Sequence, residues 1–459
     1  MKLSARNQLK GKVININKGA VNSIVTIDIG GGNIITQILG MFLTSYLTDS
    51  VGIAAAAVGT MMLVARFFDG ASDIIMGGII DKTKTRWGKA RPWLLISAPF
   101  TLVSLILTFS VPASMSDAAK LVYAYLTYIF LNCICFTAYM VSHTALLSRM
   151  TLNGQERQKM ASINQILNQA GGLAVTTFMV VLVAKFGWQM TAVIYGVIAT
   201  VLIWIGFWGT RERLLDAAPE EGKKAGTVPL KEALPAMMRN KYFFLLTALF
   251  ILILAQAAGP GSMTYYYCNV CLNNLGLLSF ISACGIVPVV IINFFVPALT
   301  KRFGRRNCLL AGAFGNTLGF FLIGIGGNVL PVIIAGFIIK GLASGVLFAC
   351  AFALAADVVD YGEWKTGIRS EGLINSCVSF GQKVGLGLGP AIASWIIAAG
   401  GYDGLAAVQT ETAKHAIVFA FGYFGAILSA LMLLAAFFMN IDKEAPTMRE
   451  ELEKKHHLA

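Results

Sequence analysis

Charged residues are scarce in this chain. They make up 13% of its 459 residues, whereas 56% are hydrophobic, and the mean hydropathy is +0.71. Soluble domains carry roughly 25% charged residues, so this composition excludes an ordinary soluble enzyme. It is typical of a polytopic membrane protein, whose apolar side chains face lipid.

Cysteines are also few, and their positions exclude a disulfide framework. The eight cysteines are scattered, and several, such as Cys133, Cys135 and Cys350, lie inside apolar runs, where a thiol behaves as a small hydrophobic side chain. Cys268 and Cys271 have CxxC spacing, for which a redox or metal role is the less favoured interpretation. Residues 1–20 have no apolar core followed by small residues, so we expect no cleavable signal peptide.

Long apolar runs dominate the chain instead. A helix needs about 20 apolar residues to cross a bilayer, and twelve runs approach or exceed this length. We therefore predict an all-α membrane protein with twelve transmembrane helices in two halves, 33–208 and 242–441, joined by a polar linker at 209–241 and followed by a tail at 442–459. The runs are 33–48, 53–80, 93–111, 120–147, 161–186, 190–208, 242–267, 277–299, 308–326, 331–359, 374–399 and 416–439.

Basic residues gather in alternate loops, which predicts the orientation of the chain. Lys and Arg cluster after the second, fourth, sixth, eighth and tenth runs, whereas the loops at 50–53, 269–276 and 327–330 are nearly uncharged. By the positive-inside rule, the basic loops and both termini are cytoplasmic. Membrane topology thus explains the net charge of +13 better than nucleic-acid binding does.

The first 32 residues differ in kind. Hydrophobic residues alternate with polar ones at Ile14 and Ile16 and again at Val25, Ile27 and Ile29. This alternation predicts a β-hairpin ahead of the first span. Such a hairpin is marginally stable by itself.

Three charges interrupt the second apolar run. Arg66, Asp69 and Asp73 are spaced by three and then four residues, which places them on one helical face. Two neighbouring carboxylates at bilayer depth need a cation between them or a bound proton. We therefore predict a site for Na⁺ or H⁺, between which the sequence does not decide. The alternative is structural pairing with Arg66 or a lysine.

Two lysines lie inside later runs. Lys383 stands among four glycines between residues 381 and 389, too deep for easy snorkelling, so a functional role is predicted. The glycines are expected to allow close helix packing. Lys340 lies about nine residues into the tenth run. It either pairs with a carboxylate or a helix-end carbonyl, or it faces an anionic substrate group such as a uronate.

Two motifs carry a resemblance to a known family. The first is Asp69-Gly-Ala-Ser-Asp73 followed by the Asp-Lys-Thr-Lys-Thr-Arg-Trp-Gly-Lys-Ala-Arg-Pro of residues 81–92. The second is Ala356-Asp-Val-Val-Asp-Tyr-Gly-Glu-Trp364, then Arg369-Ser-Glu371 and Lys383. From about residue 33 to 441 the chain resembles the glycoside–pentoside–hexuronide:cation symporters of the major facilitator superfamily, which include the melibiose carrier.

The resemblance implies a major facilitator fold and a function. The chain would move a sugar with a monovalent cation by alternating access, in the cell membrane, without covalent chemistry or a cofactor, as a monomer with no nucleic-acid partner. Asp69, Asp73 and Thr137 would bind the cation, and Lys383 would tune both ligands. A non-transporting sugar sensor on the same fold is the alternative. A sensor would not need the paired carboxylates, and this chain has both, which favours transport.

Departures from the melibiose carrier prevent its specificity from being carried over. Asn33 and Met140 stand where that carrier has sugar-binding aspartates, and Thr144 replaces a tryptophan that stacks on sugar. Two negative charges are therefore lost, and Lys340 adds a positive one if it faces inward. A preference for acidic glycosides is the resulting expectation.

A set of charged loop residues is predicted to form a cytoplasmic gate, paired in one state and exposed in the other. His143, near the end of the fourth run, is interpreted as a packing residue rather than a proton relay. The gate residues are Asp81, Arg86, Arg91, Arg157, Asp357, Asp360, Glu363, Arg369 and Glu371.

The N-terminal segment carries a second resemblance. Residues 4–13, 18–22 and 30–36 are similar to the first half of a molybdate/molybdopterin-binding domain of the TOBE/Mop type. Half of such a β domain is not expected to bind an oxyanion alone, which makes a membrane-tethered molybdate-binding module the least favoured function. We predict either a chimeric open reading frame or a recombined gene, with a junction at residues 31–36.

Overall fold

The chain is described by a computed structural model in which helices account for nearly all of the described residues. Their only β feature is an isolated bridge between Thr85 and Gly88. The structure describes residues 31–150, 154–210, 212, 238, 240–327, 329–367, 371–442, 444, 447, 448, 450 and 451, without the side chains of 147–150, 154–166, 371–373 and 375.

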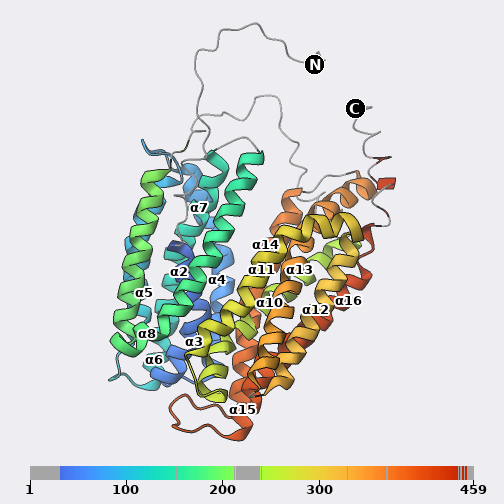
Figure 1. The fold of residues 1–459 in the computed structure, drawn as a ribbon. Coiled ribbons are helices and arrows are strands. Elements are labelled where there is room, and N and C mark those ends of the chain that lie inside the picture. Colours follow the sequence, from blue (N-terminus) through green and yellow to red (C-terminus); the bar gives the residue numbers. More distant parts are fainter. Residues whose placement is uncertain are drawn as a thin grey trace.

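The helices form two bundles that lie side by side (Figure 1). The first contains α2 (Gly31–Gln37), η1 (Ile38–Phe42), α3 (Leu43–Ser45), η2 (Tyr46–Ser50), α4 (Ala55–Lys82), α5 (Arg91–Thr108), α6 (Asp117–Ile129), η3 (Phe130–Phe136), α7 (Thr137–Met150) and α8 (Gly154–Gly209). The second contains α10 (Lys241–Tyr266), η4 (Tyr267–Cys271), α11 (Leu277–Phe303), α12 (Arg305–Gly326), α13 (Leu330–Thr366), α14 (Glu371–Ala399), α15 (Glu411–Val418), η5 (Phe419–Tyr423) and α16 (Phe424–Phe438). The η elements are π-helical segments.

All twelve predicted runs are helical over most of their described length. The fifth and sixth lie in α8, which consists of two helices that meet at a kink where Gly187 has a non-helical φ of 75°. Eight described helices are long and apolar enough to cross a membrane: Arg91–Thr108, Asp117–Leu146, Leu167–Gly209, Lys241–Cys271, Leu277–Phe303, Arg305–Gly326, Leu330–Thr366 and Glu411–Phe438. The charged α4 is not among them.

The predicted β-hairpin at residues 12–29 lies outside the described residues. The described residues begin at Gly31, which is already part of α2. A Cβ placed on Gly32 would lie 2.3 Å from the Tyr139 ring, so α2 packs closely on α7. The glycine-rich stretch therefore serves contact between helices rather than a turn.

Glycines bring α14 close to the helices on both of its sides. A Cβ on Gly385 would lie 2.4 Å from the carbonyl oxygen of Ile251 in α10, and one on Gly387 would lie 2.6 Å from Cγ of Arg66 in α4. This agrees with the expectation that the glycines around Lys383 allow close packing. Helix α14 of the second bundle therefore lies at the interface with the first bundle.

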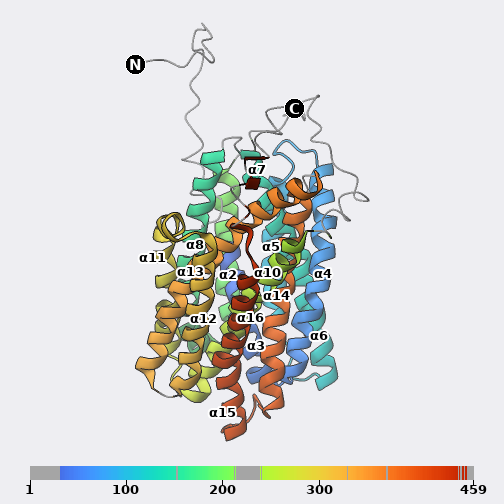
Figure 2. The same ribbon diagram turned by 90° about the vertical axis from the view of Figure 1, so that its right-hand side faces the viewer.

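One end of the molecule carries the charged loops, and we call it the basic end; it is uppermost in Figures 1 and 2. At the opposite end, where α15 lies, the bundles are joined directly. The Thr48 and Tyr266 hydroxyls are 2.7 Å apart, and the Tyr402 hydroxyl donates to Asp49 Oδ1 at 2.8 Å. A Cβ on Gly404 would lie 2.3 Å from the Thr48 carbonyl, so the loop before α15 packs tightly on η2.

At the basic end, hydrogen bonds connect the helices and loops of each bundle among themselves. In the first bundle the buried Glu212 carboxylate accepts the backbone N–H groups of Lys89, Ala90 and Arg91 at 3.0, 2.8 and 2.9 Å. Arg91 Nη2 in turn donates to the Phe207 carbonyl at 2.7 Å. An acidic residue after the last helix thus holds the start of α5.

The second bundle repeats this arrangement. Asp442 accepts the backbone N–H of Arg306 at 2.8 Å, and Arg306 Nη2 donates to the Phe437 carbonyl at 2.9 Å. The guanidinium of Arg306 also lies over the Phe437 ring, as Arg91 lies over Phe207. The two halves therefore share a local structure that their sequences do not display as a repeat.

Candidate functional site

Asp69 is held on both carboxylate oxygens. It is 8% exposed, its Oδ2 lies 3.2 Å from Arg66 Nη1, and its Oδ1 accepts the Thr137 hydroxyl at 3.1 Å. The spacing of three residues places Arg66 beside Asp69 on one face of α4. The structure thus brings Asp69, Arg66 and Thr137 together.

Asp73 meets Lys383 across the two bundles. Their side chains form an ion pair, and Lys383 Nζ also donates to the Asp69 backbone carbonyl at 3.2 Å. The Asp73 side chain is 37% exposed and that of Lys383 is 26% exposed. The pair is therefore accessible, whereas Asp69 lies behind it.

The charges of this cluster balance. Two carboxylates, Asp69 and Asp73, face two cationic side chains, Arg66 and Lys383. In this state the pairing interpretation of the carboxylates describes the contacts. A small cation would have to compete with Lys383 for Asp73. The Coulomb attraction is strongest at contact distance, and Lys383 already contacts this carboxylate.

Ser72 is a member of the cluster that the sequence did not indicate. Its hydroxyl lies 3.3 Å from the Thr137 hydroxyl and donates to the Asp69 carbonyl at 3.0 Å. With Asp69, Asp73 and Thr137 it supplies the hard oxygen atoms that a sodium ion prefers. The available signal was its position three residues after Asp69, since that spacing makes helical neighbours.

A π-helical segment positions Thr137. The segment η3 ends at Phe136, directly before Thr137, and π-helical turns are frequent at functional sites. One turn earlier, the thiol of Cys133 donates to the Ala65 carbonyl of α4 at 3.2 Å. The two contacts hold this face of the helix against α4.

Among the described residues, no three His, Cys, Asp or Glu side chains are placed to hold a metal ion.

The three residues that replace sugar contacts of the melibiose carrier lie in two places. Asn33 donates from Nδ2 to the Asn168 carbonyl of α8, so its amide is bonded within the first bundle. Met140 is 41% exposed and Thr144 is also exposed. Both continue the face of α7 that carries Thr137, toward the basic end.

Lys340 lies apart from this cluster. Its Nζ is 4.8 Å from the Phe320 ring centre and 4.7 Å from that of Phe337. Cation–π contact, rather than a carboxylate or helix-end carbonyl, is what the structure gives this ammonium group. A position between α12 and α13 weakens the expectation that Lys340 faces a bound anion.

Three of the predicted gate residues have described contacts within their own bundles. Arg86 lies over the Trp87 ring at 4.8 Å, Arg91 bonds to Phe207, and the buried Asp357 forms an ion pair with Arg305. Asp81, Asp360 and Glu363 lie near the same end in α4 and α13. The side chains of Arg157, Arg369 and Glu371 lie outside the described part of the chain.

The ring of His143 stacks on that of Tyr139, with centres 5.8 Å apart. This contact fits the packing interpretation of His143.

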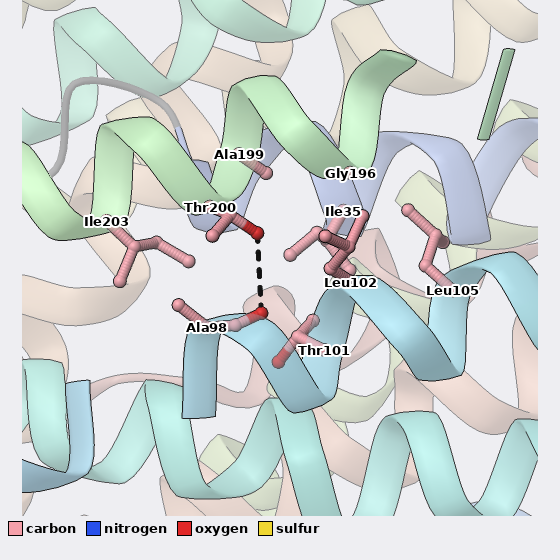
Figure 3. A pocket seen from close by; sticks show the side chains of 9 residues that line it. All are labelled: Ile35, Ala98, Thr101, Leu102, Leu105, Gly196, Ala199, Thr200 and Ile203. Atoms are coloured by element: carbon pink, nitrogen blue, oxygen red, sulfur yellow. Dashed lines mark hydrogen bonds between the residues drawn. The ribbon is translucent and has the colours of Figure 1, made fainter. Parts of the chain in front are cut away.

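A small pocket lies inside the first bundle (Figure 3). The Thr200 hydroxyl donates across it to the Ala98 carbonyl at 3.4 Å, and a Cβ on Gly196 would already lie 2.5 Å from Leu102. Such a space suits packing rather than a sugar. Its lining residues are Ile35, Ala98, Thr101, Leu102, Leu105, Gly196, Ala199, Thr200 and Ile203.

Comparisons with known proteins identify what this arrangement resembles. The family described as MFS/sugar transport protein matches residues 29–443, and the TOBE domain matches residues 3–40. The chain is 34% identical to an isoprimeverose transporter of Lactiplantibacillus pentosus, over 92% of this chain and 89% of that protein. It is 31% identical to a glucuronide carrier protein homolog of Escherichia coli strain K12, over 79% of each.

Solved structures support the fold. The nucleoside transporter NupG superimposes with a TM-score of 0.64 at 13% identity, covering 91% of this chain and all of that one. A bacterial homolog of the human lysosomal transporter Spinster, in an inward-facing and unoccupied conformation, gives 0.64 at 12% identity, over 91% and 94%. At these identities the likeness concerns the fold alone.

Proposed function

Because this chain belongs to the family of MFS/sugar transport proteins, we propose that it carries a sugar or glycoside together with a monovalent cation by alternating access. The supporting observation is the cluster of Asp69, Asp73, Thr137 and Lys383. It combines oxygen ligands from the first bundle with a competing ammonium group from the second. A site divided between two bundles can respond to their movement.

The cluster suggests how the two ligands are coupled. A cation that binds Asp73 displaces Lys383, whose ammonium group is then free to bond a sugar hydroxyl. Each ligand thereby favours the other, with a coupling free energy of about 1–3 kcal/mol in typical cases. Either Na⁺ or a proton on Asp73 would release Lys383.

The proposed topology has twelve spans in two six-helix halves, with the basic end in the cytoplasm of a cell membrane. The eight apolar helices supply nine of these spans, because α8 contains two runs on either side of Gly187. The helices from α2 to η2, the charged α4, and α14 would supply the other three. The bonds between Thr48 and Tyr266 and between Tyr402 and Asp49 would then close the outer side.

Substrate identity is proposed from the relatives. Their names indicate one uncharged sugar, isoprimeverose, and one class of carboxylated sugars, the glucuronides. These two define the first substrates to test, and with Asn33 and Met140 in place of carboxylates, an acidic glycoside is the one we expect to compete better.

The test is uptake of labelled isoprimeverose and of a labelled glucuronide into right-side-out vesicles. An inward Na⁺ gradient and an inward proton gradient are imposed separately, and a protonophore distinguishes the two. Gradient-driven accumulation of either sugar is expected. Saturable binding without accumulation would support a sugar sensor instead, and the absence of both would contradict the proposal.

A further inference from the structure

Helices α4 and α14 run antiparallel and in register between the bundles. Near the middle of both helices, Gly387 of α14 admits the Arg66 side chain. One turn nearer the basic end on α14, the long Lys383 side chain reaches the Asp69 carbonyl and the Asp73 side chain of α4. With Gly387 opposite Arg66, antiparallel helices place Phe380, seven residues before Gly387, near the level of Asp73. On α4 the next turn in the same direction begins near Gly77.

At that next turn the contact between the helices stops. No neighbouring atom lies within 4 Å of a Cβ placed on Gly77. Phe380, three residues before Lys383, is 61% exposed. The uncovered ring of Phe380 therefore lies near the level of Asp73, and the bare Gly77 lies one turn nearer the basic end on α4.

Phe380 lies on the side of α14 that faces α4. It is seven residues from Gly387, a separation that changes direction around a helix by only about 20°. The side that packs on α10 is marked instead by Gly381, which contacts Thr247, and by Gly385, which contacts Ile251. The exposed ring of Phe380 therefore faces the space between the two bundles.

A third helix contributes a polar group at this level. The contact of Cys133 in η3 with Ala65 and that of Thr137 in α7 with Asp69 advance by four residues on both helices. The helix formed by η3 and α7 therefore runs parallel to α4. Seven residues beyond Thr137, Thr144 lies near the level of Gly77 and is exposed. Its hydroxyl donates to the Met140 carbonyl at 2.9 Å, and its oxygen can accept a further hydrogen bond beside the open faces.

We propose that Phe380 is the stacking surface for the ring of the transported sugar. A pyranose has an apolar C–H face and a rim of hydroxyls; the face would lie on Phe380, with Gly77 leaving room for the thickness of the ring. Its hydroxyls would reach the Asp73–Lys383 pair and Thr144. Aromatic walls with a few placed polar groups are typical of small-molecule sites. This assignment rests on the proposed sugar transport.

The first test compares the KM of uptake between matched variants. Phe380→Ala should raise KM roughly tenfold with little change in kcat, and Phe380→Trp should retain a KM near that of the wild type. Phe67→Ala is the control, because Phe67 is 74% exposed on another face of α4. A KM within twofold of wild type for Phe380→Ala would overturn the assignment.

Two adjacent glycines supply a second comparison. Gly77→Leu should fill the space for the ring and raise KM at least as much as Phe380→Ala. Gly78 also has open space around it, but it follows the exposed Ile74 by four residues and so faces away from α14. Equal effects of Gly77→Leu and Gly78→Leu would contradict the proposed placement.

Alkylation separates this inference from the transport proposal. In inside-out vesicles, the thiol of Phe380→Cys should react with a membrane-impermeant maleimide above the wild-type level, and isoprimeverose or a glucuronide should slow that reaction. Protection without accumulation would retain the sugar site and reject symport. Accumulation with no protection and an unchanged KM would retain symport and reject Phe380 as the stacking surface.

Discussion

The two ends of the interface between the bundles differ in what they bond to. At the opposite end, Thr48 bonds to Tyr266 and Asp49 to Tyr402, so the bundles are held to each other. At the basic end, the described bonds of Arg91 and Arg306 stay within one bundle. Contacts of the first kind must break when the molecule opens on that side, whereas those of the second kind can persist throughout.

The bonds that join the bundles are few enough to be reversible. A hydrogen bond contributes about 1 kcal/mol net, and one to a charged group about 1.5–3 kcal/mol. The Thr48–Tyr266 and Asp49–Tyr402 bonds therefore sum to a few kcal/mol at most. Ligand binding can shift an equilibrium of that size.

The largest effect is expected between the two ends, at the only described ion pair that we place between the bundles. Asp73→Asn should abolish sugar accumulation, because it leaves Lys383 without its carboxylate and removes the proposed cation ligand; Asp69→Asn should do the same. The measurement is gradient-driven uptake, normalised to protein in the membrane. Asp117→Asn is the control, since the Asp117 side chain is fully exposed at 100%. Full accumulation in the double Asp69→Asn, Asp73→Asn variant would refute the proposed cation site.

The next effect tests the persistent contacts of the basic end. Glu212→Ala removes the acceptor of three backbone N–H groups, and we expect a loss of about 2–4 kcal/mol of stability. Thermal unfolding in detergent measures it. Asp442→Ala removes one such acceptor in the second bundle and should cost less. An equal or larger cost for Asp442→Ala would refute the view that the number of capped groups sets the effect.

A smaller effect is expected at the end where the bundles join. Tyr402→Phe removes the bond to Asp49 and should shift the population toward outward-open forms by roughly tenfold. Alkylation of Ser394→Cys by an impermeant reagent added outside reports it, because Ser394 is fully buried and faces Gly59 in the closed form. Tyr423→Phe, within the second bundle, is the control. Unchanged labelling in Tyr402→Phe would mean that this bond does not help to close the outer side.

The smallest effect is expected at Lys340, away from both ends. Lys340→Gln should lower stability by about 1 kcal/mol through loss of its contacts with Phe320 and Phe337. Because the ammonium group lies between these rings, we now expect the preference between a glucuronide and its neutral counterpart to survive the substitution. Competition of the two sugars for uptake measures this preference. Its disappearance would restore the anion-facing role that the sequence suggested for Lys340.

The sequence predicted those parts of the structure that follow from periodicity. The apolar runs predicted the helices, and helical spacing placed Arg66, Asp69 and Asp73 on one face. Thr137 came from the family resemblance, and Lys383 came from its depth in the eleventh run as well as from the resemblance. The structure places both beside the two aspartates.

What the sequence did not predict depends on approach between distant segments. In the sequence, Glu212 is one of several charged residues of the polar linker, yet in the structure its carboxylate binds the start of α5. Lys340 could have faced several neighbours, and only the packing of α12 on α13 gave it two rings. Phe380 looked like one more apolar residue, because its exposure depends on where α4 and α14 separate.

The carboxylate that caps α5 also has a consequence for synthesis. Glu212 follows Arg91 by 121 residues, and Asp442 follows Arg306 by 136. At about 5–20 residues per second, each loop waits roughly 6–27 s on the ribosome before its acceptor is made. A nascent chain stalled before either acid would keep a basic loop with open N–H groups. Capped N–H groups in the basic loop therefore distinguish a completed bundle from an unfinished bundle, and chaperones and proteases could respond to this difference.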